Sequence, residues 1–183
     1  MKKVLIALLI SLLLVGCGEL ENLTGIEESS ISEELTDLET VTIDRVIDGD
    51  TVKVILETEE SERIRLLLID TPESVHSEIE PQPYGEEASE FAKSVLKKGQ
   101  TVELERGNPE RDTYDRLLAY IWIDDDVNFN QLMIEEGFAR VAYVYEPNTM
   151  YLDEFEKAEM KAKEDGKNIW SIDGYVESQF EDY

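Results

Sequence analysis

The segment VTIDRVIDGDTVKVILETEESERIRLLLID, residues 41–70, decides the fold. It contains three runs rich in β-branched and aliphatic residues, VTIDRVI, TVKVILE and ERIRLLLI, which are separated by DGD and by the polar TEES. Runs of this length with short polar breaks are typical of antiparallel strands joined by tight connections. We therefore expect a meander of three strands to open the folded domain.

Signals for helices and further strands follow this segment. Residues 84–99, YGEEASEFAKSVLKKG, have apolar positions at helical spacing, acids in the first turn, lysines in the last and a glycine stop. Further along, TVELERG and YDRLLAYIWI indicate strands, FARVAYVY a short extended piece, and NFNQLMIEEG and YLDEFEKAEMKAKEDG two helices. This order predicts an α+β fold, the five-stranded antiparallel Greek-key barrel called the OB-fold, with three helices.

The N-terminus indicates export and a lipid anchor. Residues 1–16 begin with MKK, and their apolar run VLIALLISLLLV is shorter than the roughly 20 residues that span a bilayer, so we expect a signal peptide. The run ends in LVGC, which resembles the lipobox of bacterial lipoproteins, in which the cysteine is lipidated and becomes the first mature residue. A chance cysteine is the alternative, but Cys17 is the only cysteine and has no disulfide partner.

Composition divides the rest of the chain. Residues 18–40 contain eight acidic and no basic residues, and such a segment cannot bury enough apolar surface to order itself. The predicted parts are therefore a signal peptide at 1–16, a lipidated cysteine and acidic flexible tether at 17–40, the barrel domain at 41–172, and an acidic C-terminal tail at 173–183. We expect the protein on the extracytoplasmic face of the cell membrane.

Two carboxylates stand beside strands that otherwise read as apolar. Asp50 begins the second predicted strand and Asp70 ends the third, so the hairpin should bring them to the same end of the barrel. Carboxylate and carbonyl oxygens without nearby Cys or His favour Ca²⁺ or Mg²⁺ over zinc. A plain turn at DGD is the alternative reading.

Two arginines are candidates for binding a phosphate. Arg65 lies five residues before Asp70, on what reads as the same strand, and Arg116 stands near the start of RLLAYIW. The planar guanidinium donates two hydrogen bonds to phosphate oxygens and stays charged at any working pH. Surface arginines in a very acidic protein are the alternative.

Several motifs together resemble the thermonuclease family, the staphylococcal-nuclease-like domains. These are IDGDTVKV, RLLLIDTPE, YGEEASEFAK, YDRLLAYIW, GFARVAYVY and NIWS, which span about residues 41–171 and occur in the family's order. The resemblance implies that Ca²⁺ is bound by Asp50, Asp70 and the backbone carbonyl of Thr71, with Asp48 just outside these ligands. It further implies that Arg65 and Arg116 contact the phosphate and that Glu73 holds the attacking water, either as general base or as an orienting group.

Tyrosines complete the implied site. Tyr143 and Tyr145 alternate with Ala142 and Val144 and should share a face of a strand, and the resemblance places them, with Tyr114, at the border of a nucleotide pocket. Stacking on bases is tolerant of sequence. Simple packing of a strand is the alternative. The sole histidine, His76, falls in the loop SVHSEIEPQP, and we expect a solvated loop residue there.

The sequence also departs from the family. Asp115 occupies a position that is often glycine in relatives, where its charge could pair with Arg116. The loop at 74–83 holds Glu78 and Glu80 and no lysine. Removing Lys2 and Lys3 with the signal peptide takes the formal net charge from −26 to −28. We therefore expect weak contact with nucleic acid outside the site, because the surface repels polyanions.

These observations predict a membrane-anchored, extracellular, Ca²⁺-dependent nuclease. It should hydrolyse single-stranded and double-stranded DNA and RNA to 3′-phosphate ends, as a monomer without a protein partner. One alternative is a non-catalytic OB-fold lipoprotein that binds nucleic acid at the cell surface, but such a module should have lost an arginine or a metal carboxylate. The other, a structural or Ca²⁺-binding envelope protein, leaves Arg65, Glu73 and Arg116 unexplained.

Overall fold

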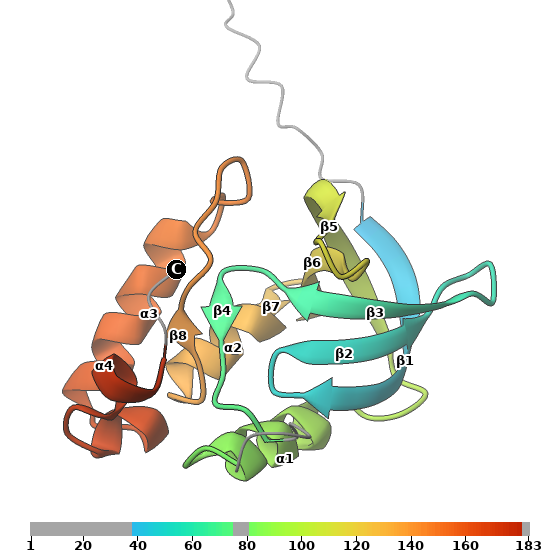
Figure 1. Ribbon diagram of the computed structural model, residues 1–183. Helices are drawn as coiled ribbons and strands as arrows, with labels where there is room; N and C mark the ends of the chain where they lie inside the picture. Colours follow the sequence, from blue (N-terminus) through green and yellow to red (C-terminus); the bar gives the residue numbers. More distant parts are fainter. Residues whose placement is uncertain (1–37, 75–80, 181–183) are drawn as a thin grey trace, which may run out of the picture. The chain divides into compact units, whose positions relative to one another are not determined.

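A computed structural model describes residues 38–74 and 81–180 (Figure 1). The predicted signal peptide, Cys17, residues 18–37 of the tether and His76 lie outside the described residues. Of the helices within the described ranges, none has the length and apolar character needed to cross a bilayer.

A closed barrel forms the centre of the domain. Its strands are β1 (Leu38–Asp48), β2 (Thr51–Ile55), β3 (Ser61–Leu66), β5 (Thr101–Arg111) and β6 (Leu117–Asp124), extended by the short β7 (Val127–Asn128). Neighbours in the order β3-β2-β1-β5-β6-β7 pair antiparallel, and β3 pairs in parallel with β6 to close the barrel. The predicted five-stranded barrel is confirmed, with a closing pair that is parallel.

The three predicted helices are present. They are α1 (Gly85–Val95), α2 (Phe129–Glu135) and α3 (Leu152–Glu164), and α3 lies alongside β8 (Arg140–Val141) in Figure 1. The core joins barrel strands to all three helices through fully buried side chains, among them Ile43, Val52, Ile64, Leu104 and Ile121 from the barrel and Ala88, Phe129, Met133 and Phe155 from the helices. Burial of these apolar side chains fixes the helices against the barrel.

The third predicted strand does not run through to Asp70. It ends at Leu66, and the chain turns at Leu68, which has a left-handed φ of 62°. A separate strand, β4 (Ile69–Asp70), then pairs antiparallel with β8, so that Asp70 stands opposite Arg140. The prediction that Arg65 and Asp70 share a strand is therefore wrong, because a turn that the apolar run RLLLID conceals separates them.

Both ends of the domain differ from the predicted boundaries. Residues 38–40, assigned to the tether, are the start of β1 and pair with β5. The segment assigned to an acidic tail contains α4 (Tyr175–Gln179), which follows the 3₁₀ helix η1 (Asn168–Ser171). Tyr175 and Phe180 are 5 % and 8 % exposed and pack with Ile169. The acidic composition of this segment led to the prediction of a tail, although its two aromatic residues can be buried and stabilise this packing.

Candidate active site

Two adjoining hollows contain every predicted site residue that the structure describes. We name them the carboxylate hollow, of about 500 Å³, and the tyrosine hollow, of about 620 Å³. The first is lined by Ile47, Asp48, Asp50, Thr51, Arg63, Arg65, Asp70, Thr71, Glu73, Arg116 and Tyr143. The second includes Tyr114, Tyr143 and Tyr145 together with Arg65, Arg111, Asp112, Arg116 and Glu146. Because Arg65, Arg116 and Tyr143 line both, a ligand that fills both hollows would contact both arginines.

Arg65 brings the two metal-ligand candidates together. Its Nη2 lies 3.1 Å from Oδ2 of Asp50 and 3.7 Å from Oδ1 of Asp70. Its Nη1 donates to the carbonyl oxygens of Leu66, at 2.7 Å, and Ile69, at 2.9 Å. The guanidinium thus ties the turn between β3 and β4 and faces both carboxylates, which explains how they meet although a turn separates Arg65 from Asp70.

A second arginine, Arg140, reaches Asp70 from β8. Its Nε and Nη2 both lie 3.3 Å from Oδ2 of Asp70, as the cross-strand register requires. Sequence reasoning missed this residue. The available signal was a charged residue inside the apolar run GFARVAYVY, where a charge needs a partner.

The crowding of the two carboxylates suits a bound cation. Burial, and then the charge of Asp50, raise the pKa of Asp70 above its ordinary value, against the opposing effect of Arg65 and Arg140. A cation beside both carboxylates would relieve this repulsion. Asp50, Asp70 and Thr71 line one hollow, and the carboxylate and carbonyl oxygens predicted as donors are a set that fits a hard ion such as Ca²⁺.

Gly49 lets the β1–β2 turn lie close to Thr71. A Cβ at position 49 would lie 2.8 Å from Oγ1 of Thr71, so a larger residue there would require Thr71 to shift. Asp48, next to it, accepts hydrogen bonds at Oδ1 from the Gly49 amide, at 2.8 Å, and from the Ser74 hydroxyl, at 2.6 Å. Asp48 therefore binds the β1–β2 turn to the residue after Glu73, and its place just outside the Ca²⁺ ligands stays a prediction.

The backbone of Glu73 is held on both sides by Gln82. The Glu73 amide donates to Oε1 of Gln82 at 2.8 Å, and the Gln82 amide donates to the Glu73 carbonyl at 3.0 Å. Gly85, which begins α1, also lies against Glu73, since a Cβ there would clash with the Glu73 backbone carbonyl oxygen. Sequence reasoning missed Gln82 because nothing in the loop pattern marks it.

Asp112, rather than Asp115, pairs with Arg116. Oδ2 of Asp112 lies 2.6 Å from Nε of Arg116, and its Oδ1 accepts from the backbone amides of Tyr114 and Arg116, both at 2.9 Å. Burial would raise the pKa of Asp112, but these hydrogen bonds outweigh it and hold the pKa below its ordinary value. The ion pair engages Nε, so it does not use the fork of terminal nitrogens.

Asp115 itself points to another partner. Its carboxylate lies 3.6 Å from Nη1 of Arg111, and its φ is 62°, a left-handed value that Asp tolerates better than most residues. The predicted pairing of Asp115 with Arg116 is therefore wrong. The turn DTYDR, in which an Asp side chain bonds the amide two residues on, was the signal for Asp112.

The tyrosines line one hollow, although the argument from alternation fails. Strand β8 ends at Val141, and Tyr143 has a left-handed φ of 54°. The Tyr143 ring instead packs under Arg65, with its centroid 4.9 Å from Cζ. Tyr114 and Tyr145 are 73 % and 58 % exposed, an unusual state for large aromatic side chains.

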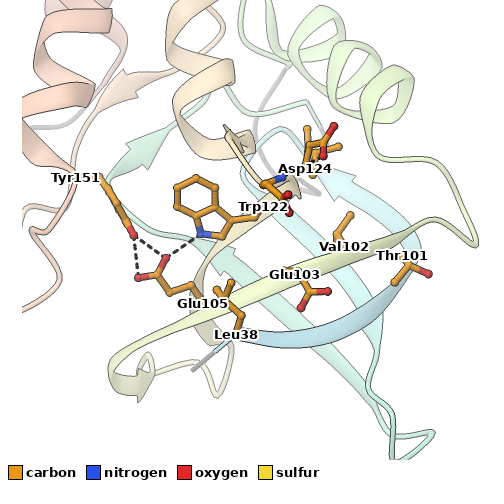
Figure 2. A pocket seen from close by; sticks show the side chains of 10 residues that line it. Leu38, Thr101, Val102, Glu103, Glu105, Trp122, Asp124 and Tyr151 are labelled. Carbon is orange, nitrogen blue, oxygen red and sulfur yellow. Dashed lines mark hydrogen bonds between the residues drawn. The ribbon is translucent and has the colours of Figure 1, made fainter. Parts of the chain in front are cut away.

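A third hollow, of about 310 Å³, lies over β5 and β6 and shares no residue with the other two (Figure 2). Its buried carboxylate, Glu105, accepts hydrogen bonds from Nε1 of Trp122, at 2.8 Å, and from the hydroxyl of Tyr151, at 2.9 Å. Both oxygens are thus engaged by neutral donors. We interpret this group as a tie between the barrel and the residue that precedes α3.

Comparison with known proteins identifies the family of this chain. The family described as "Staphylococcal nuclease homologue" matches residues 63–172. Endonuclease YncB of Bacillus subtilis (strain 168) is 38 % identical over 96 % of this chain and 95 % of its own length. The SPbeta prophage-derived endonuclease YokF of the same strain is 46 % identical over 79 % of this chain, which spans 47 % of that protein. Thermonuclease of Staphylococcus hyicus is 41 % identical over 73 % of this chain and 76 % of its own length. This chain therefore belongs to the staphylococcal nuclease homologue family.

Proposed function

We propose that the protein is a Ca²⁺-dependent nuclease that hydrolyses phosphodiester bonds of DNA and RNA and leaves 3′-phosphate ends. The nuclease class is supported by the family and by relatives named endonuclease and thermonuclease. The observation that supports the Ca²⁺-dependent mechanism is that one hollow contains Asp50, Asp70, Glu73, Arg65 and Arg116. Neither a binding module nor a structural envelope protein requires that set.

Each residue has a distinct task in the proposed reaction. Glu73 orients a water or accepts its proton, and the water oxygen attacks phosphorus. Arg65 and Arg116 donate to the phosphate oxygens, which gain negative charge as the fifth bond forms. The bond to the 5′ oxygen then breaks, and that oxygen takes up a proton from solvent, so the fragments end in a 3′-phosphate and a 5′-hydroxyl. Asp50, Asp70 and the Thr71 carbonyl would hold Ca²⁺, which would add positive charge near the phosphate.

The tyrosine hollow suits bases of either nucleic acid. Exposed Tyr114 and Tyr145 offer flat faces for stacking, and stacking contributes about 1–3 kcal/mol per base with little regard to sequence.

The direct test of the proposed function is to incubate the full chain with single-stranded DNA and with RNA, each with Ca²⁺ or with a chelator. Cleavage in Ca²⁺ alone, with fragments that a 3′-phosphatase shortens by one phosphate, is expected. Intact substrate in Ca²⁺ would refute the proposal.

We expect an unusual response of substrate affinity to salt. An ordinary basic nuclease loses affinity steadily because each neutralised phosphate releases counterions. Here the acidic surface also repels the substrate, and salt screens that repulsion over a Debye length of about 10 Å at 0.1 M. The Michaelis constant for single-stranded DNA at saturating Ca²⁺ should therefore vary weakly, or pass through a minimum, between about 0.01 and 0.2 M salt. A steep monotonic rise would contradict this prediction.

We also propose a lipid anchor on Cys17, which would hold the protein as a monomer at the extracytoplasmic face of the membrane. The support is the sequence LVGC after a basic start and an apolar run. A single acyl chain binds a bilayer marginally, whereas two or more bind stably.

The variant Cys17→Ser tests the anchor. It should move the protein from the membrane fraction to the medium, with unchanged activity per molecule, because Cys17 lies far in sequence from the proposed site residues. Fractionation of producing cells, with immunodetection in both fractions, measures the change. A variant that remains in the membrane fraction would indicate an uncleaved N-terminal helix instead.

A further inference from the structure

The C-terminal segment packs against the loop that bears Glu73. We call residues 175–180, which comprise α4 and Phe180, the C-terminal cap. The cap was expected to be a free acidic tail, yet Tyr175 and Phe180 are buried. They lie outside the main core of the barrel, in a small cluster with Ile169, Tyr84, Trp170 and Val176.

The first contact of the cap passes through Gln82. The Gln82 side-chain amide donates from Nε2 to the backbone carbonyl of Gln179 at 3.1 Å. Its Oε1 at the same time accepts from the Glu73 amide at 2.8 Å. One planar amide therefore joins the cap to the backbone of Glu73, and its orientation is fixed only while both bonds exist.

Two further contacts place the cap in register with this loop. The Tyr175 hydroxyl donates to the Pro83 carbonyl at 2.6 Å, directly after Gln82. The ring of Phe180 lies 4.9 Å from Cζ of Arg140, which also contacts Asp70. The cap thus touches the partners of both Glu73 and Asp70 without lining either hollow.

We propose that the C-terminal cap positions Glu73 through Gln82, so that its buried residues Tyr175 and Phe180 contribute to cleavage although they touch no substrate. The inference rests on the proposed role of Glu73. Small errors in the position of a group that holds the nucleophile are costly, and a misplacement of about 1 Å can lower a rate by about a hundredfold. The positioning residues are Gln82, Tyr175 and Phe180.

A double-mutant cycle tests this coupling in the full chain. Deletion of residues 174–183 should lower kcat on single-stranded DNA by about tenfold, while KM changes less than about twofold because the cap does not line the tyrosine hollow. Gln82→Ala should lower kcat by a similar factor. The two changes together should lower kcat no further than either one, because both break the same path.

A milder variant distinguishes loss of positioning from general unfolding of the protein. Phe180→Leu keeps an apolar side chain in the buried site but removes the ring that packs on Arg140. It should lower kcat in the wild-type background and have no added effect in the Gln82→Ala background. Glu177→Gln, at an exposed position of α4, is the matched control and should leave kcat and KM unchanged. Thermal unfolding of each variant verifies that it is folded at the assay temperature.

The outcomes separate the inference from the proposed function. Multiplicative losses in the cycle, a loss that appears in KM alone, or unchanged kcat in the folded deletion and Phe180→Leu variants would each overturn the positioning role. Glu73→Gln is measured beside them. Full activity of Glu73→Gln would overturn the proposed role of Glu73 itself. If Glu73→Gln is inactive but the cap variants keep the wild-type kcat, only the inference about the cap is overturned.

Discussion

Replacement of Arg116 by lysine is expected to lower kcat at least about tenfold, near 1.4 kcal/mol of transition-state stabilisation. Asp112 holds Arg116 through Nε, which leaves the forked terminal nitrogens for a phosphate. Lysine keeps the positive charge but has no fork, so it cannot make the paired bonds. Steady-state kinetics on a single-stranded oligonucleotide at saturating Ca²⁺ measures the change.

Arg116 is a cleaner test than Arg65. Arg65 also donates to the carbonyls of Leu66 and Ile69, so its replacement would leave buried acceptors unsatisfied and weaken the fold as well as the chemistry. Arg45→Lys is the matched control, because that side chain is exposed on β1 and lines neither hollow. Arg116→Lys with wild-type turnover would exclude a bidentate contact with phosphate from the mechanism.

The sequence predicted most of the barrel because its signals are local. Polar breaks between apolar runs marked the strands, and helical spacing with a glycine stop marked α1. The break between β3 and β4 was missed because the run LLLI within RLLLID contains no polar break. The left-handed turn falls on Leu68, and leucine is not a residue type that predicts a turn. The packing of the cap was missed because the many acids of residues 173–183 indicated a solvated tail, although Tyr175 and Phe180 are aromatic residues that can be buried.

The structure brings the predicted site residues together, but most of the contacts that hold them were not predicted. Motif order identified the carboxylates, Glu73 and the arginines, and the structure brings them to one hollow. What holds them depends on pairings distant in sequence, such as Asp70 with Arg140 across β4 and β8 and Gln82 with Gln179. A single sequence does not show which distant residues pair, although the charge of Arg140 within an apolar run indicated that it needs a partner. It also misassigned Arg116 to its neighbour Asp115, although Asp112 has the turn geometry that reaches it.

An effect at least as large is expected at the proposed metal ligands. Asp50→Asn and Asp70→Asn should each weaken Ca²⁺ binding and lower activity in parallel, by at least about tenfold, since each removes one of two charged oxygen ligands of a hard cation. The fold should survive, because an Asn oxygen at position 50 can still accept from the Thr51 hydroxyl, as Asp50 does at 2.8 Å. Asp125→Asn, in the exposed turn after β6, is the control and should change neither property.

Calorimetric titration of Ca²⁺ into the protein without substrate separates binding from turnover. If Asp50 and Asp70 hold the ion, the loss of affinity will appear in this titration, and excess Ca²⁺ will restore part of the activity. Mg²⁺ should substitute poorly, because it requires tight octahedral geometry and sheds its water reluctantly. Full cleavage in chelator, or unchanged Ca²⁺ affinity in both variants, would show that these carboxylates serve Arg65 and Arg140 as ion-pair partners and that the cation lies elsewhere or is not needed.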